Sequence, residues 1–213
     1  MKHKEWTNIM QIEDIRELIM KLNDQQRKIL DDFCERLIHD DGSKFYLYLA
    51  GEAGTGKSFL LRIMIEVLKY LKLTPGDDLR KPPAIIIAPT ANAACIINGK
   101  TIESALGMLP RNTSTFSKRK SDRASHLTFL YEDVAVVFCD EISMVGSSKF
   151  TRMNFQLQDI KGNVDFMGGL SFVAVGDLRQ LPPVRDRFIY EKNCLDRRPA
   201  MSPSHWDDNF LIY

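Results

Sequence analysis

The chain has 213 residues, and its 29 lysines and arginines nearly balance its 28 aspartates and glutamates, leaving a formal net charge of +1. Hydrophobic residues make up 44% and charged residues 27%. This composition is typical of a globular protein and excludes a disordered tail, a collagen-like chain and a disulfide scaffold. The neutral balance also argues against a protein that binds nucleic acid through bulk positive charge, although a local basic groove is still possible.

Cysteine usage and hydropathy predict a chain that works inside the cell and away from membranes. The four cysteines (Cys34, Cys95, Cys139 and Cys194) lie far apart and form no C-x-x-C pair, so we expect reduced thiols and no zinc site. No apolar run reaches the roughly 18 residues that a membrane span needs. The first residues lack the apolar core of a secretory signal.

The N-terminal region, residues 1–41, is predicted to be helical. Apolar residues recur three or four positions apart over residues 12–22, which indicates a short amphipathic helix. Asn23 then stands where a second helix would begin, with Gln26 at the glutamine position of a capping box. The apolar stripe of that helix continues to about residue 38.

Residues 42–213 are predicted to form an α/β domain with a mostly parallel, five-stranded sheet flanked by helices. The five expected strands are rich in β-branched or aromatic residues and cover residues 45–50, 84–88, 134–139, 171–175 and 210–213. Helical patterns separate the first four strands, and a long helix is expected over residues 57–71. Two stretches look irregular, at residues 110–126 and 182–205.

The first expected strand leads into a complete phosphate-binding loop, Gly51-Glu52-Ala53-Gly54-Thr55-Gly56-Lys57-Ser58. Its glycines let backbone N–H groups close around phosphate oxygens without interference from side chains. We expect the Lys57 ammonium to contact the β- and γ-phosphates of ATP, and the Ser58 hydroxyl to bind Mg²⁺. The placement between a strand and a long helix is the context that this loop requires.

An acidic pair, Asp140-Glu141, follows the apolar strand at residues 134–139. An acid at the end of a buried strand is the Walker B arrangement, in which Asp140 would hold Mg²⁺. Glu141 would then polarise the attacking water as a general base. A third segment, residues 176–184, follows the fourth strand, and the amide of Gln180 in it can hydrogen-bond a γ-phosphate. Standing alone, that segment would be interpreted as a proline-rich turn.

Together, the phosphate loop, the run Asp140-Glu141-Ile142-Ser143-Met144-Val145 and the run Gln180-Leu181-Pro182-Pro183-Val184 resemble motifs I, II and III of the Pif-type (petite integration frequency) DNA helicases. These are superfamily 1B relatives of the RecD helicases. The resemblance runs from about residue 22 to the last residue and implies a RecA-like core. It also implies that Gln26 contacts the adenine base, because residues 22–26 are similar to the family's nucleotide-base motif.

Residues 88–94 and 99–102 resemble motif Ia, which in this family touches single-stranded DNA. The resemblance therefore implies DNA contacts at Thr90, Asn92 and Thr101. Two departures weaken that expectation, since Ala91-Asn92 stands where relatives usually carry Gly-Lys, and Glu103 replaces the usual histidine. A carboxylate at Glu103 would repel DNA phosphates that approached it.

Basic side chains crowd the irregular stretch at residues 110–126. They are Arg111, Lys118, Arg119, Lys120 and Arg123, opposed by Asp122 alone. Such a run is either a solvated loop or an arm that contacts nucleic-acid phosphates, and both interpretations stay open on the residues alone. The resemblance favours the second and implies DNA binding by Lys118, Arg119 and Lys120, because the family's insertion between motifs Ia and II helps to bind and split DNA.

The resemblance implies the N-terminal motor domain of an ATP-dependent 5′→3′ DNA helicase that acts on single-stranded and forked DNA. Family roles are DNA repair, recombination, replication and telomere maintenance, in the nucleus or the mitochondrion. One alternative is a nucleotide-binding, DNA-binding or regulatory module without turnover. Another is a different P-loop enzyme, although no Asn-Lys-x-Asp segment of a GTPase is present.

The second RecA-like domain of the family is expected to be absent from these 213 residues, because motifs IV to VI would follow the last strand. We therefore expect weak nucleotide binding and little catalysis from this chain by itself.

Overall fold

The computed structural model describes residues 10–39, 42–74, 77–78, 80–108, 118–180, 183, 186–189 and 210–213. The helices are α1 (Ile12–Met20), α2 (Asp24–Ile38), α3 (Lys57–Lys72), α4 (Ala91–Ile96), α5 (Ile102–Leu106), α6 (Lys118–Leu130) and α7 (Ser147–Lys161), with short 3₁₀ turns η1 (Ile142–Met144) and η2 (Phe166–Gly169). The strands are β1 (Tyr46–Ala50), β2 (Ala84–Ala88), β3 (Lys100–Thr101), β4 (Val136–Cys139), β5 (Ser171–Gly176) and β6 (Phe210–Ile212).

These strands form one parallel sheet in the order β3-β2-β4-β5-β1-β6. The predicted α/β class and parallel sheet are confirmed. The predicted number of five strands is wrong, because the described residues contain a sixth strand, β3, of two residues. So short a strand has no alternation that a sequence pattern can reveal.

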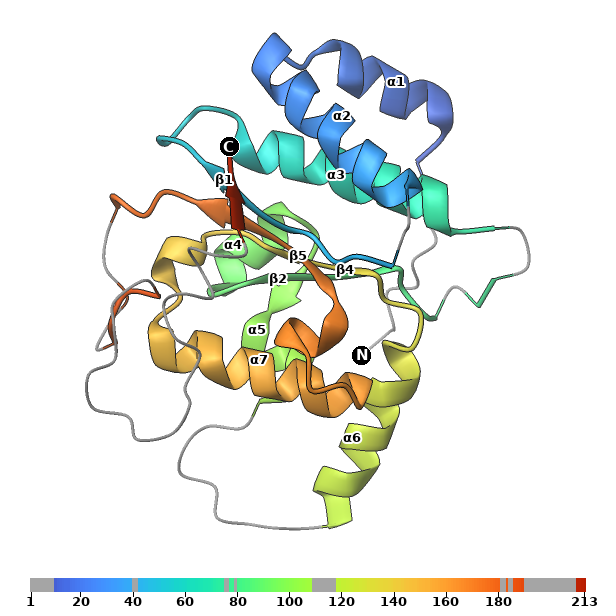
Figure 1. Ribbon diagram of the computed structural model, residues 1–213, viewed down its shortest axis with the longest axis vertical. Helices are drawn as coiled ribbons and strands as arrows, with labels where there is room; N and C mark the ends of the chain where they lie inside the picture. Colours follow the sequence, from blue (N-terminus) through green and yellow to red (C-terminus); the bar gives the residue numbers. More distant parts are fainter. Residues whose placement is uncertain are drawn as a thin grey trace.

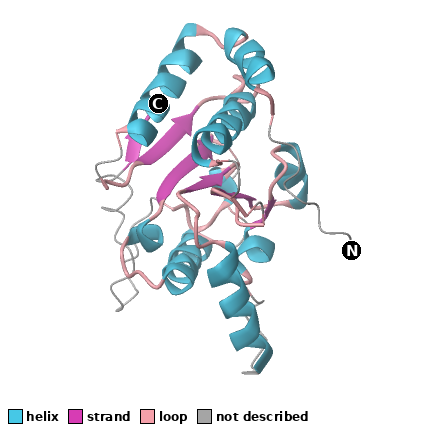
Figure 2. Cartoon of the chain, turned by 90° about the vertical axis from the view of Figure 1, so that its right-hand side faces the viewer, coloured by secondary structure: helices cyan, strands magenta, loops and turns pink. Residues whose placement is uncertain are grey.

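Helices cover both faces of the sheet, so the domain has three layers (Figure 1). Side chains on successive strand positions point to opposite faces, and the two core clusters follow this alternation. Val136 and Phe138 of β4 pack with α1 to α4, whereas Val137 and Cys139 pack with α5, α6 and α7. Figure 2 shows the strands between the two helical layers. Burial on both faces explains why the strands are continuous apolar runs.

The two N-terminal helices form as predicted. Asn23 accepts a hydrogen bond from the Gln26 N–H at 2.9 Å, and the Gln26 side chain accepts one from the Asn23 N–H at 3.1 Å. This reciprocal pair is the predicted capping box, which is confirmed. Ile15, Leu30 and Phe33 bury their side chains in the same cluster as α3 and the sheet. The proposed boundary near residue 41 stays a prediction.

The prediction of irregular structure over residues 110–126 is wrong for the second half of that stretch, because helix α6 begins at Lys118. Its first turn consists of Lys118, Arg119 and Lys120, which offer no apolar stripe from which a helix could be predicted. Residues 109–117 and most of the predicted irregular stretch at 182–205 lie outside the described residues.

Tyr213, which follows the edge strand β6, is tied to α2 by polar contacts. The Tyr213 hydroxyl donates to Asp32 Oδ2 at 2.6 Å, and Arg36 donates to both carboxylate oxygens of Asp32 at 2.8 and 3.1 Å. Burial by itself would raise the pKa of Asp32, but the hydrogen bonds from Arg36 and Tyr213 outweigh it and lower that pKa. The charged form of Asp32 is therefore favoured by folding.

Asp32→Asn is expected to lower the free energy of unfolding at pH 7 by about 1 kcal/mol. Because the folded-state pKa of Asp32 lies below its unfolded value of about 3.9, its contribution is fully present above that value and is lost as the pH falls through the folded pKa. Urea unfolding of both proteins between pH 7 and pH 3 should show the difference shrinking only at the acid end. A difference that stays constant with pH would contradict this assignment.

Candidate nucleotide-binding site

Parallel pairing brings the three predicted motifs to one edge of the sheet. Strand β5 lies between β4 and β1, with Cys139 paired to Ala174 and Ala50 paired to Gly176. The residues that follow these strands, Gly51, Asp140 and Asp177, therefore leave the sheet at the same edge. In open parallel sheets, ligands bind outside the carboxyl ends of the strands.

The phosphate loop joins β1 to α3 and takes backbone conformations that suit glycine. Gly54 and Gly56 both have φ of +83°, which is in the left-handed region. A Cβ on Gly51 would lie 2.9 Å from Thr55 Oγ1, so the Thr55 hydroxyl would have to move. Helix α3 begins at Lys57, within the last two residues of the loop, and has no acidic residue in its first turn. Its N–H groups and dipole therefore favour an anion at this end.

Lys57 folds back over the start of the loop. Its ammonium donates to the carbonyl oxygens of Gly51 at 2.6 Å and of Glu52 at 2.7 Å. The positive charge is thus held beside the loop backbone, where phosphate oxygens would replace the two carbonyls as hydrogen-bond acceptors.

Ser58 and Asp140 connect motif I to motif II across the sheet edge. The Ser58 hydroxyl donates to Asp140 Oδ2 at 3.0 Å, while the Glu141 N–H donates to Asp140 Oδ1 at 2.9 Å. Asp140 itself is only 3% exposed. A hydroxyl and a carboxylate oxygen side by side fit Mg²⁺, which prefers oxygen ligands and usually keeps water and phosphate oxygens as its other ligands. Within the described ranges, no cluster of three or more metal-ligating side chains occurs.

Glu141 has the backbone and electrostatic surroundings of a functional residue. Its φ of 52° and ψ of 43° place it in the left-handed region, at a cost of about 1–3 kcal/mol. Burial raises the pKa of its carboxyl, the charges of Asp140 and Asp177 raise it further, and Lys57 opposes them. A carboxylate with a raised pKa is a better proton acceptor near neutral pH.

Motif III leaves the end of β5 as a tight turn. The Gln180 side-chain amide donates to Asp177 Oδ2 at 3.2 Å, and its N–H donates to the Asp177 carbonyl at 3.0 Å. The Tyr48 hydroxyl donates to the Gly176 carbonyl at 3.4 Å and accepts from the Leu178 N–H at 3.2 Å. The sequence alone assigned no role to Asp177 or Tyr48, because their partners lie in the turn geometry or across the sheet.

Gln26 reaches the phosphate loop from the start of α2. Its side-chain amide donates to the Thr55 carbonyl at 3.1 Å. A Cβ on Gly56 would lie 2.7 Å from the same nitrogen. The structure therefore places the predicted base-contacting residue at the mouth of the loop, although its contact with adenine stays a prediction.

The motif Ia residues lie at the β2–β3 edge of the same sheet. Thr90 caps α4 by accepting a hydrogen bond from the Ala93 N–H at 3.2 Å, and Thr101 caps α5 by accepting one from the Ser104 N–H at 3.3 Å. Asn92 is exposed. Both hydroxyls thus have a structural role, and DNA contact by these three residues stays a prediction.

Glu103, which would repel DNA phosphates if it were unpaired, forms an ion pair. Its Oε1 lies 2.9 Å from Lys149 Nζ. Burial by itself would raise the pKa of Glu103, but the hydrogen bond and charge of Lys149 lower it. The departure from the family pattern is therefore compensated locally by a positive charge on α7.

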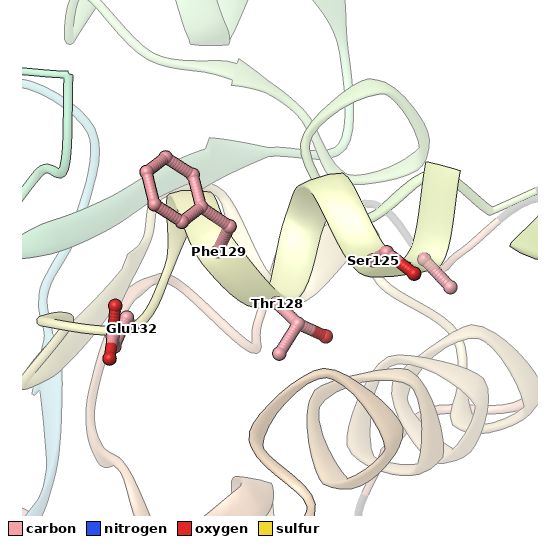
Figure 3. A pocket seen from close by; sticks show the side chains of 5 residues that line it. Ser125, Thr128, Phe129 and Glu132 are labelled. Carbon is pink, nitrogen blue, oxygen red and sulfur yellow. The ribbon is translucent and has the colours of Figure 1, made fainter. Parts of the chain in front are cut away.

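The basic stretch is described only in part. Lys118, Arg119, Lys120 and Arg123 belong to α6, but the placement of their side chains lies outside the description, as does Arg111 altogether. The far end of α6 carries an open surface hollow beside Thr128, Phe129 and Glu132 (Figure 3). Lys81 lies 4.5 Å from the centre of the Phe129 ring, so one face of that ring is already covered.

The parallel sheet, the phosphate loop after β1 and the acidic pair after β4 define a P-loop nucleotide-binding protein with a RecA-like core. Comparison with known proteins then gives its family. A family model described as "PIF1-like helicase" matches residues 21–194. The chain belongs to this family.

A curated relative, "ATP-dependent DNA helicase PIF1" of Candida albicans, is 32% identical over 169 residues, which are 79% of this chain and 18% of that protein. The chain therefore spans less than a fifth of this relative.

No helix among the residues described here is long and apolar enough to cross a membrane.

Solved structures of the family share the fold. The crystal structure of a Pif1 helicase from Candida albicans superimposes with a TM-score of 0.64 at 26% identity, covering 90% of this chain and 39% of the other. A Pif1 helicase from Bacteroides in complex with ADP-AlF3 and ssDNA gives a TM-score of 0.54 at 25% identity, covering 79% of this chain and 38% of the other.

Gly56→Ala is expected to destabilise the protein more than Gly42→Ala, its matched control. Both glycines have nearly the same positive φ, +83° and +82°, but a Cβ on Gly42 meets nothing within 4 Å. The strain common to both should cost about 1 kcal/mol, whereas only the substitution at position 56 would also displace Gln26. Chemical denaturation measures the two losses, and equal losses would show that Gln26 does not restrict position 56.

Proposed function

We propose that the chain is the N-terminal RecA-like motor domain of an ATP-dependent 5′→3′ DNA helicase, which couples ATP hydrolysis to translocation on single-stranded DNA and to duplex unwinding. The observation that carries the ATP-hydrolysing part of this proposal is the hydrogen bond from Ser58 to Asp140, which joins the phosphate loop to the acidic pair. Membership of the PIF1-like helicase family supports the helicase activity. The 5′→3′ polarity of translocation comes only from the resemblance of the motifs.

The residues divide the proposed reaction among them. Bound Mg²⁺ and ATP would supply the metal charge and the transferable phosphoryl group. Ser58 and Asp140 would hold the metal, and Lys57 would move from its two carbonyl partners to the phosphates. Glu141, with its raised pKa, would accept the proton of the attacking water.

Gln180 would contact the γ-phosphate of the nucleotide, and Gln26 would contact its base. The Gln180 amide, now held by Asp177, would donate to the γ-phosphate and so distinguish ATP from ADP. Gln26 would contact the adenine base while keeping its bond to the phosphate loop. Glu52, Ala53 and Thr55 would supply backbone N–H groups to the phosphates.

Single-stranded DNA and forked duplex DNA are the proposed substrates. Thr90, Asn92 and Thr101 at the sheet edge and Lys118, Arg119 and Lys120 on α6 are the proposed contacts. The ssDNA in the Bacteroides Pif1 complex supports a nucleic-acid partner. A second RecA-like domain is the proposed protein partner, and the proposed setting is intracellular, in the nucleus or mitochondrion, in repair, recombination, replication or telomere maintenance.

A longer protein that carries both motor domains should hydrolyse ATP faster when single-stranded DNA is added. Lys57→Ala should abolish this turnover because the phosphates lose their cation. Glu141→Gln should reduce the turnover by about 10²–10⁴-fold because it cannot accept a proton, yet it should still bind ATP. A coupled ATPase assay with and without DNA, together with nucleotide titrations, measures each effect.

The same assay separates the alternatives. Nucleotide binding without turnover in the longer wild-type protein would favour a regulatory module, and turnover without any response to DNA would contradict a helicase. The 213 residues by themselves should show little ATPase, because an arginine from a facing domain contributes about 10³–10⁵ in rate in P-loop enzymes. Robust unwinding by this stretch alone would contradict that part of the proposal.

A further inference from the structure

The start of helix α7 is capped by a residue from a distant part of the chain, Asp186. Asp186 Oδ2 accepts a hydrogen bond from the Ser148 N–H at 3.1 Å, and Oδ1 accepts one from the Ser148 hydroxyl at 3.0 Å. The helix has no side-chain cap of its own at Gly146 and no acidic residue in its first turn. Asp186 therefore provides both the acceptor and the negative charge that a helix amino end favours.

The residues around Asp186 leave space for its carboxylate and attach its segment to α7. A Cβ on Gly146 would lie 2.3 Å from the Asp186 side chain, so only glycine leaves it room. The Ser147 N–H donates to the Arg187 carbonyl at 2.8 Å, and Ile189 buries its side chain in the core cluster beside α7. The segment at residues 186–189 is thus fixed to the amino end of α7.

A second contact joins the same two parts of the chain closer to the sheet. A Cβ on Gly176 would lie 3.1 Å from the Ile142 N atom and 3.3 Å from the Ser143 N atom. Motif III begins at Gly176, and the 3₁₀ turn η1 at Ile142–Met144 comes directly after Glu141. The chain that carries motif III therefore approaches the segment after Glu141 at Gly176, ahead of Gln180, and again at Asp186, two positions beyond the motif.

Along the sequence, Gln180 lies between these two attachments. Towards Gly176 it is held by Asp177, and Asp186 is six positions further along the chain. We propose that Asp186 is a positioning residue: by fixing the chain beyond motif III to the start of α7, it restricts Gln180, which is to distinguish a nucleoside triphosphate from a diphosphate. This inference rests on the proposed function of Gln180.

Isothermal titration calorimetry of this chain with Mg²⁺ and either adenylyl-imidodiphosphate or ADP tests the proposal. Asp186→Ala should weaken binding of the triphosphate analogue by up to about fivefold, the limit reached when the whole free energy of a lost cap is drawn from binding, and should leave ADP affinity within about twofold. Asp186→Asn keeps an acceptor oxygen and should restore most of the loss. Asp165→Ala, which removes a carboxylate beyond the other end of α7, should change neither affinity.

A double-mutant cycle distinguishes positioning from a purely structural role. If Asp186 acts through Gln180, Asp186→Ala combined with Gln180→Ala should lose no more triphosphate affinity than Gln180→Ala alone. Additive losses, equal losses for both nucleotides, or no loss in Asp186→Ala would overturn the inference while leaving the nucleotide site intact. A wild-type chain that showed not even weak binding of either nucleotide would overturn the proposed function together with the inference.

Discussion

Parallel pairing of β4, β5 and β1 is the constraint on which the rest of the site depends. Because these strands are neighbours and point the same way, motifs that are far apart along the chain emerge at one edge. The 3.0 Å contact between Ser58 and Asp140, which are 82 positions apart, exists only because of that pairing. The buried strands supply the rigidity, and the loops at their ends supply the chemistry.

Contiguous features were predictable from the sequence because their physics is local. The phosphate loop, the strand at Ala84–Ala88 and the capping box of Asn23 and Gln26 each appear in one short stretch. Features that depend on partners distant in the sequence were not predictable. The cap on α7 joins Ser148 to a residue 38 positions away, and no local pattern marks such a contact.

The sequence-based predictions missed strand β3 and the first turns of α6, and both omissions have physical causes of this kind. The two-residue strand β3 forms because it pairs with Ile87 and Ala88 of β2, and its own residues carry no strand pattern. The amino end of α6 is made of basic residues without an apolar stripe. Glu103 shows the converse case, since a charge that looked unfavourable in the sequence is neutralised by Lys149 from another helix.

The hydrogen bonds from the Lys57 ammonium to the carbonyl oxygens of Gly51 and Glu52 have a consequence for ligand binding. If Lys57 binds phosphate as proposed, both carbonyls would act as internal competitors, because they occupy two of the three N–H donors of its ammonium. The observed affinity would then be the intrinsic affinity of the open loop multiplied by the fraction of molecules in which Lys57 is released. Phosphate binding by Lys57 would thus be an exchange of partners, in which the loop backbone gives up the cation that the ligand takes.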